Sequence, residues 1–94
     1  MLDLPVDLEF TPEFEALYGA LPPRDVARVD EMLDRLEVHH ARPEMRGILR
    51  VGAHTLFHTP RIYAPSAVYR VTWVYHPTEE GVAVCVTVAE VESR

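Results

Sequence analysis

The sequence predicts a single small α+β domain. Two stretches in the first half carry apolar residues at helical spacing, and three stretches in the second half alternate in the manner of strands. With 94 residues, 48% of them hydrophobic, the chain is long enough for one core and too short for a second. We therefore expect one domain over residues 1–94. In it, a short N-terminal strand and a helical hairpin precede a three-stranded antiparallel meander, and the helices cover one face of the sheet.

The N-terminal stretch predicts a strand followed directly by a helix. In "PVDLEF", apolar residues alternate at Val6, Leu8 and Phe10, as in a strand. Thr11 then offers a side-chain oxygen that caps a helix, and Pro12 suits the first helical position. An apolar stripe follows at the spacing i, i+3, i+4, i+7, formed by Phe14, Leu17, Tyr18 and Leu21.

A second helix is predicted over residues 24–38, after the break made by "LPP". Its inward face would be formed by Val26, Val29, Met32, Leu33 and Leu36. The two helices form the predicted hairpin. Residues 39–53 show no sustained period and contain one proline and two glycines, so we expect an irregular connection there.

Three strands are then predicted, in "HTLFHTPRIY", "AVYRVTWVYH" and "GVAVCVTVAEV". Pro60 has no N–H to donate, so the first of them should be an edge strand or carry a bulge. The middle strand has an apolar row that we expect to face the helices, namely Tyr69, Val71, Trp73 and Tyr75. Arg70 should then lie on the opposite face, available for binding.

Charge is unevenly distributed along the chain. The net charge of −6 argues against general attraction to nucleic acids. Residues 1–41 hold ten acids against three arginines, whereas residues 42–78 hold five arginines against one glutamate. The chain has no lysine, and arginine binds phosphate or carboxylate bidentately. The middle of the chain is therefore the candidate anion-binding part.

Other features limit the class of protein. Cys85, the single cysteine, excludes an intrachain disulfide and lies in an apolar strand, where we expect a buried and inert thiol. No apolar run reaches the roughly 20 residues that span a bilayer, and "MLDLPVDLEF" carries acids where a signal peptide carries positive charge. We expect a cytoplasmic protein. No glycine-rich phosphate loop is present, and we predict no cofactor.

The order of these elements and motifs resembles the RelE/ParE toxin superfamily of type II toxin–antitoxin modules. "VDLEFTPEFEALYGALPP" is similar to the family's first strand and helix, and "EMLDRLEVH" to its second helix. "MRGILRVG" stands at the family's linking motif, "PRIY" at its leucine-arginine strand and "VYRVTWVY" at its tyrosine-arginine-valine strand. The resemblance implies a RelE-like fold over nearly the whole chain.

The resemblance also implies a function and two site residues. It implies a ribosome-dependent mRNA endonuclease or, in the ParE branch, an inhibitor of DNA gyrase, held inactive by a co-encoded antitoxin. Arg61 and Arg70 match the two strand arginines of the family. The chain has no lysine and ends in "VAEVESR" without the family's terminal aromatic residue or histidine, which leaves a non-catalytic interaction protein of the same fold open as an alternative.

Metal-independent RNA cleavage requires a base, an acid and a cation that stabilises the phosphorane. The candidate catalytic residues are Arg61, Arg70, His76 and His58, and the candidate RNA- or partner-binding residues are Arg46, Arg50, Arg61 and Arg70. A zinc site of His54, His58 and His76 is the weaker alternative because the spacing motifs of zinc sites are missing, and we predict no metal. The expected partners are the ribosome with its mRNA and an antitoxin segment whose acids meet the arginines.

Overall fold

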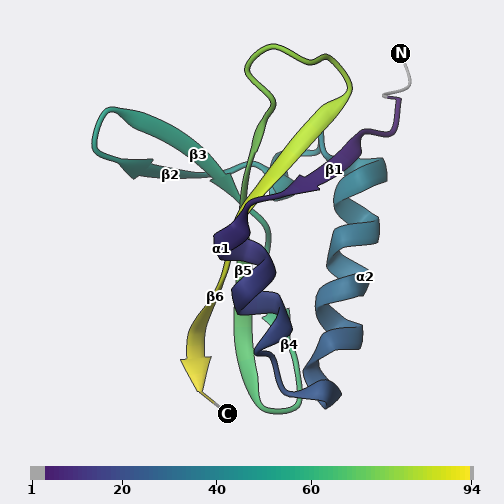
Figure 1. The fold of residues 1–94 in the computed structure, drawn as a ribbon, viewed down its shortest axis with the longest axis vertical. Coiled ribbons are helices and arrows are strands. Elements are labelled where there is room, and N and C mark those ends of the chain that lie inside the picture. The colour runs from purple at the N-terminus through teal and green to yellow at the C-terminus, as the bar shows by residue number, and fades with distance from the viewer. Residues whose placement is uncertain (1–3, 94) are drawn as a thin grey trace.

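A computed structural model describes residues 4–93 and shows two helices packed on a mixed sheet (Figure 1). Residues 1–3 and 94, the outermost residues of the predicted domain, lie outside the described part. The α+β class is confirmed. The elements are β1 (Asp7–Phe10), α1 (Pro12–Gly19), α2 (Pro23–His39), the 3₁₀ turn η1 (Pro43–Met45), β2 (Gly47–Val51), β3 (His54–His58), β4 (Ile62–Tyr63), β5 (Ala67–Tyr75) and β6 (Val82–Ser93). Neither described helix is long and apolar enough to cross a membrane.

The sheet has six strands, so the prediction of a three-stranded meander was wrong. Its order is β1-β6-β5-β3-β2, and β4 pairs with β5. The N-terminal strand β1 joins the sheet by pairing parallel to β6, while the other pairs are antiparallel. The chain between β1 and its parallel neighbour β6 is long, as such a pairing requires, and contains both helices and the other four strands.

The connection over residues 39–53, predicted to be irregular, contains η1 and β2. β2 pairs with β3 along its whole length through a two-residue turn, in which Gly52 has a φ of +60. The glycines and proline suggested an irregular chain, yet Gly52 supplies the positive φ that such a turn needs. The β2–β3 hairpin projects from the body of the protein, and only its base pairs with β5 (Figure 1).

The predicted strand over residues 54–63 divides into β3 and β4 at Pro60, as expected for a residue without an N–H. Buried Thr59 keeps the chain attached to β5 at the break. Its amide donates to the carbonyl of Val71 at 2.9 Å, and its hydroxyl oxygen accepts from the Val71 amide at 3.1 Å. A side chain thus replaces a backbone acceptor, and the ladder continues on the far side of the proline.

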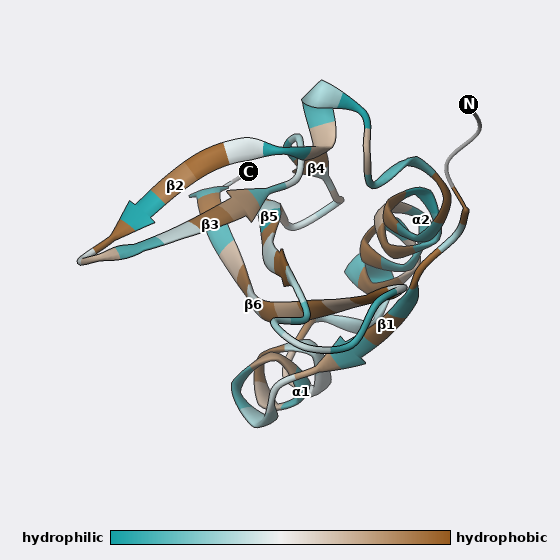
Figure 2. Ribbon diagram, turned by 90° about the horizontal axis from the view of Figure 1, so that it is seen from above, coloured by the Kyte–Doolittle hydropathy of each residue, from teal (hydrophilic) through white to brown (hydrophobic). Residues whose placement is uncertain are grey.

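The core lies between the helices and the face of β5 that carries Tyr69, Val71 and Trp73, as predicted. Trp73 is fully buried, and its indole N–H donates to the carbonyl of Met45 at 2.8 Å, which ties η1 to the central strand. The neighbouring strand β6 contributes the small residues Ala83 and Cys85 to the core. Burial, with a smaller contribution from Glu37, raises the pKa of the Cys85 thiol to about 12, so this thiol is protonated and inert at neutral pH. In Figure 2 the tip of the β2–β3 hairpin points away from both helices.

The start of α1 is fixed by its predicted cap and by an irregularity in β6. The Thr11 hydroxyl accepts from the Phe14 amide at 3.0 Å, which confirms the N-cap. The same hydroxyl donates to the carbonyl of Val86 at 2.6 Å. Val86 is the extra residue of β6 at a register shift, because Thr72 pairs with Thr87 and Trp73 pairs with Cys85. The cap therefore also satisfies the carbonyl that the bulge removes from the ladder.

A buried carboxylate joins α2 to the sheet, which sequence analysis did not predict. Asp25, in the first turn of α2, accepts from the Tyr69 hydroxyl at 2.6 Å and from the Ser66 amide at 3.0 Å. Burial opposes ionisation of Asp25, but these hydrogen bonds and the charge of Arg24 outweigh it and lower its pKa. Burial, followed by the bond to Asp25, raises the pKa of Tyr69 to about 12.

Tyr69→Phe should lower the free energy of unfolding by about 1–3 kcal/mol near neutral pH, because buried Asp25 loses a donor. The contribution of Asp25 is present above its ordinary pKa of 3.8 and is lost as the pH falls through the lowered value. That of Tyr69 is complete below its ordinary pKa of 10.0 and is lost as the pH rises towards about 12. The difference between wild type and variant in urea unfolding should therefore shrink at both extremes of pH.

Tyr18→Phe is the matched control for this measurement. The Tyr18 hydroxyl donates to Asp30 at 2.6 Å, but both residues are only partly buried. Its loss should be smaller, about 0.5–1.5 kcal/mol. Equal losses in the two variants would mean that the Asp25 carboxylate does not anchor α2.

Candidate functional site

Arg70 lies on the face of the sheet opposite the helices, because it alternates along β5 with core residues Tyr69 and Val71. In the β5–β6 ladder, Arg70 pairs with Ala89 of β6. Two residues further along the same face, Thr72 pairs with Thr87 on one side and with His58 on the other. We call these four residues the Arg70 face: His58, Arg70, Thr72 and Thr87.

The Arg70 side chain has unused hydrogen-bonding capacity. Its Nε is buried and has no hydrogen-bond partner among the described residues, the only such buried side-chain atom among them. A buried guanidinium N–H without an acceptor is costly, and an anionic ligand would supply one. A phosphate or carboxylate also matches the planar fork of arginine. The local chemistry is therefore that of an anion-binding residue held on a rigid strand.

His58 is held in one orientation beside Thr72. Its imidazole lies against Gly47 of β2, so close that a Cβ at position 47 would be 2.2 Å from Cε1 of the ring. Nδ1 lies 3.1 Å from the carbonyl oxygen of Thr59. Because a carbonyl only accepts, Nδ1 carries the proton in the neutral ring, which leaves Nε2 as the acceptor. His58 therefore presents a nitrogen that suits a general base.

Arg61 serves a different surface from Arg70. Although it directly precedes β4, the neighbour of β5, Arg61 lines a hollow beside α2 together with Arg28 and Arg35. The strand break at Pro60 separates it from the β3 part of the sheet. Ile62 pairs with Tyr69, so Arg61 and Arg70 follow closely on neighbouring strands, but the hollow beside α2 is lined by Arg61 and not by Arg70.

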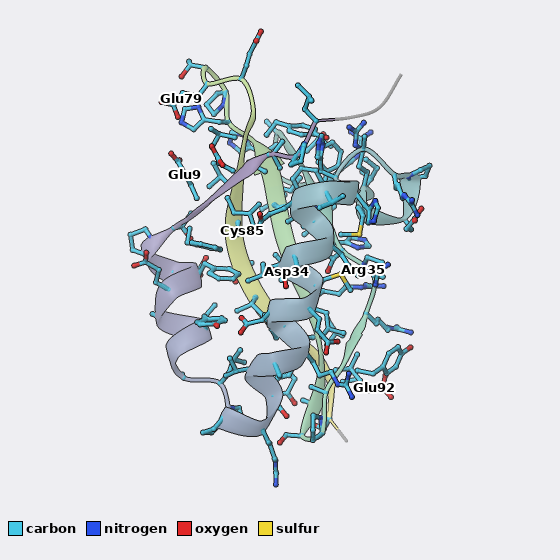
Figure 3. All side chains as sticks on the ribbon, turned by 90° about the vertical axis from the view of Figure 1, so that its right-hand side faces the viewer. Glu9, Asp34, Arg35, Glu79, Cys85 and Glu92 are labelled. Atoms are coloured by element: carbon cyan, nitrogen blue, oxygen red, sulfur yellow. The ribbon has the colours of Figure 1, made fainter. Side chains whose placement is uncertain are left out.

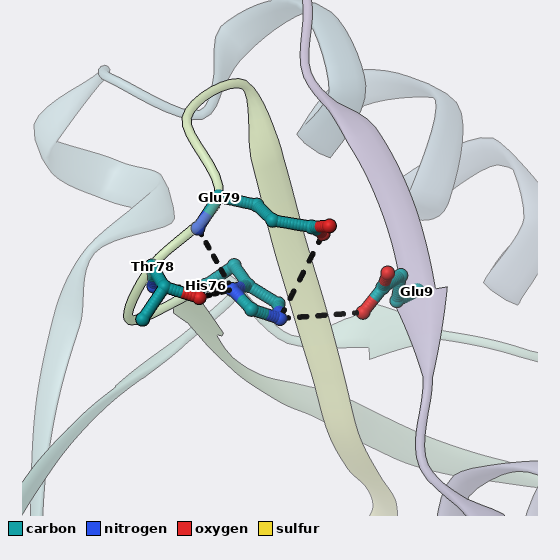
Figure 4. Close-up of polar contacts among 4 residues, drawn as sticks. All are labelled: Glu9, His76, Thr78 and Glu79. Carbon is teal, nitrogen blue, oxygen red and sulfur yellow. Dashed lines mark hydrogen bonds and ion pairs between the residues drawn. The ribbon is translucent and has the colours of Figure 1, made fainter.

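His76 lies in the β5–β6 turn, next to the carboxylates of Glu9 and Glu79 (Figure 4). Its Nδ1 accepts from the amides of Thr78 and Glu79 at 3.2 and 3.0 Å. Its Nε2 lies 4.0 Å from a carboxylate oxygen of Glu9 and 3.8 Å from one of Glu79. Since Nδ1 accepts two hydrogen bonds, Nε2 carries the proton of the neutral ring and faces the acids as a donor. No hydrogen bond or ion pair within residues 4–93 joins His76 to the arginines with which it was grouped from the sequence, and its imidazole stabilises a turn.

The tautomer of His76 also affects metal binding. Glu9, His76 and Glu79 are the only group of potential metal ligands within residues 4–93, and a metal on Nε2 would require Nδ1 to give up its acceptor role. His54, from the zinc alternative, is exposed on the β2–β3 hairpin and does not join His58 and His76 in such a group. Metal binding at Nε2 of His76 would therefore cost the turn the two hydrogen bonds that Nδ1 accepts.

Arg46 and Arg50, the remaining candidate binding residues, have different environments. Arg46 is half-buried. Its Nε donates to the carbonyl of His40 at 3.1 Å, and its guanidinium also donates to the Tyr75 hydroxyl. The guanidinium charge lies over the rings of Phe57 and Tyr75. These contacts close the edge of the core on the helix side. Arg50 is exposed on β2 and remains available to a partner.

Sequence analysis missed the polar network to which Arg46 belongs. Buried His40 contacts the Tyr75 hydroxyl through Nδ1 at 2.7 Å, and its Nε2 lies 2.8 Å from the carbonyl oxygen of Leu4. The available signal was Tyr75 itself, because a tyrosine in an inward-facing row needs a partner for its hydroxyl. That partner comes from the connection after α2, far away in sequence.

Comparison with known families does not assign the chain to any of them. No family model matches the sequence, and no curated protein matches it. The resemblance to RelE/ParE toxins stays a prediction.

Gly47→Ala should lower the free energy of unfolding by about 1–3 kcal/mol and displace the His58 ring, because the new methyl group overlaps the imidazole. Removing the ring in the double variant Gly47→Ala/His58→Ala should restore most of that loss, which a double-mutant cycle by urea unfolding measures.

Gly19→Ala is the control for this substitution, because no atom lies within 4 Å of a Cβ there and its φ is not positive. It should leave stability unchanged or raise it slightly. If the cycle gives no coupling between positions 47 and 58, Gly47 does not hold the histidine in place.

Proposed function

We propose that this protein is a RelE/ParE-like toxin of a type II toxin–antitoxin module that acts on RNA in the ribosome through the Arg70 face. The observation that carries the proposal is the buried Nε of Arg70, which has no hydrogen-bond partner within residues 4–93 and lies on the same face as His58, whose Nε2 is the acceptor nitrogen of the neutral ring. The element order supports it, since a strand and two helices precede the antiparallel strands. We also propose a cytoplasmic location and a co-encoded antitoxin.

The Arg70 face offers a chemistry for metal-independent cleavage. Nε2 of His58 takes the proton from a ribose 2′-hydroxyl, whose oxygen attacks the adjacent phosphorus. Arg70 stabilises the negative charge of the phosphorane. The bond to the 5′-oxygen then breaks, which leaves a 2′,3′-cyclic phosphate and a 5′-hydroxyl. Water supplies the proton to the leaving oxygen, because His76 lies elsewhere and the face has only threonine hydroxyls besides.

A non-catalytic interaction protein of the same fold is the second candidate. It is favoured by the dispersal of the expected site residues. Of the catalytic candidates, His76 contacts a turn and Arg61 lies beside α2, and the binding candidate Arg46 packs at the edge of the core. Such a protein would bind an anionic partner at Arg70 and cleave nothing. Inhibition of DNA gyrase is the remaining alternative from the resemblance, and a DNA supercoiling assay separates it from mRNA cleavage.

Induced expression of the protein should stop bacterial growth, and Arg70→Ala should restore it. The variant should also lower the affinity for ribosome-bound mRNA at least about tenfold, because a charge-assisted bond to phosphate is lost. Primer extension on cellular mRNA reports cleavage, and His58→Ala should abolish cleavage while RNA binding remains.

Arg61→Ala is the matched control, because it removes a strand arginine from the other surface. Growth arrest should persist in this variant. Normal growth with folded wild-type protein present would contradict the toxin proposal. Arrest without cleavage would instead favour the second candidate.

A further inference from the structure

A groove lined by arginines runs between α2 and β4, on a surface that the proposed function does not use. Arg28 and Arg35 from α2 and Arg61 beside β4 line a hollow of about 200 Å³. Arg28 and Tyr63 also line an adjoining hollow of about 250 Å³, which continues along the turn before β5. Because these two residues are shared, the hollows form one elongated depression, which we call the arginine groove.

The fold builds the groove from distant parts of the sequence. Arg28 and Arg35 are seven residues apart, close to two helical turns, and so lie on one face of α2. Figure 3 shows Arg35 on the side of α2 away from α1. The floor is apolar, formed by Met32 and Ile62, which belong to the core.

Positive charge in the groove is incompletely compensated. Arg28 pairs with Glu31 at 3.2 Å, whereas Arg35 and Arg61 have no ion pair or hydrogen bond within residues 4–93. Three guanidinium groups thus meet one carboxylate in a protein whose net charge is −6. Convergence of like charges is unfavourable, and an anionic ligand relieves it.

We propose that the arginine groove binds an extended acidic segment of a partner protein, in which Asp or Glu side chains alternate with apolar ones. Carboxylates would pair with Arg35 and Arg61, and apolar side chains would lie on the floor and against Tyr63, which is 60% exposed. A nucleic acid fits less well, because its continuous phosphates would run across Glu31, which lines the groove. The groove is separate from the Arg70 face and does not depend on the proposed function.

The test measures fluorescence anisotropy of a labelled peptide in which Glu and Leu alternate. Wild-type protein should bind it, binding should weaken as sodium chloride is raised, and a peptide of alternating Lys and Leu should not bind. The double variant Arg35→Ala/Arg61→Ala should bind at least about tenfold more weakly. A labelled single-stranded RNA is tested in parallel.

Arg42→Ala/Arg50→Ala is the control pair, because it removes two exposed arginines outside the groove. It should bind the acidic peptide as wild type does, and so should Arg70→Ala, which separates this site from the Arg70 face. Urea midpoints confirm that each variant is folded. The proposal is overturned if the groove variant binds as tightly as wild type, if both double variants lose binding equally, or if RNA displaces the peptide from the groove.

Discussion

Both candidate surfaces depend on the hydrogen bonds that the buried Asp25 carboxylate accepts. It receives hydrogen bonds from Tyr69 in β5 and from Ser66 in the turn before it, so the first turn of α2 is attached to the central strand. With Tyr69 held inward, the alternation of the strand turns Arg70 to the opposite face. With the start of α2 held beside β4, Arg28 and Arg35 come to lie next to Arg61.

The sheet therefore separates two kinds of anion-binding chemistry. On the face opposite the helices, Arg70 is partly buried on a rigid strand, and its Nε has no hydrogen-bond partner in the described part of the chain, which suits a ligand held in a fixed geometry. In the arginine groove, Arg35 and Arg61 are exposed and free to adapt, which suits a flexible segment whose attraction is screened by salt. The net charge of −6 describes neither surface, because arginines outnumber the single lining carboxylate, Glu31, in the arginine groove, and the Arg70 face contains no carboxylate among its four residues.

Local patterns in the sequence were sufficient for some elements and insufficient for others. The Thr11 cap, the apolar row of β5 and the break at Pro60 were predictable, because each depends on neighbouring residues alone. Strand β2 was not predictable, since its conformation depends on pairing with β3 and since the glycines in and after it are also typical of loops. Of the catalytic candidates, Arg70 and His58 share one face of the sheet, since strand register pairs His58 with Thr72, two residues from Arg70 in β5.

The sequence by itself determined the α+β class, the inward row of β5 and the position of Arg70 on the opposite face. These follow from periodicity, which a chain carries whatever its neighbours are. Only the tertiary structure decided that Asp25 is an anchor, that Arg46 closes the core, that His76 stabilises an acidic turn and that Arg61 joins α2. The physical reason is that a charged side chain acquires its role from its partners, and these come from segments distant in sequence.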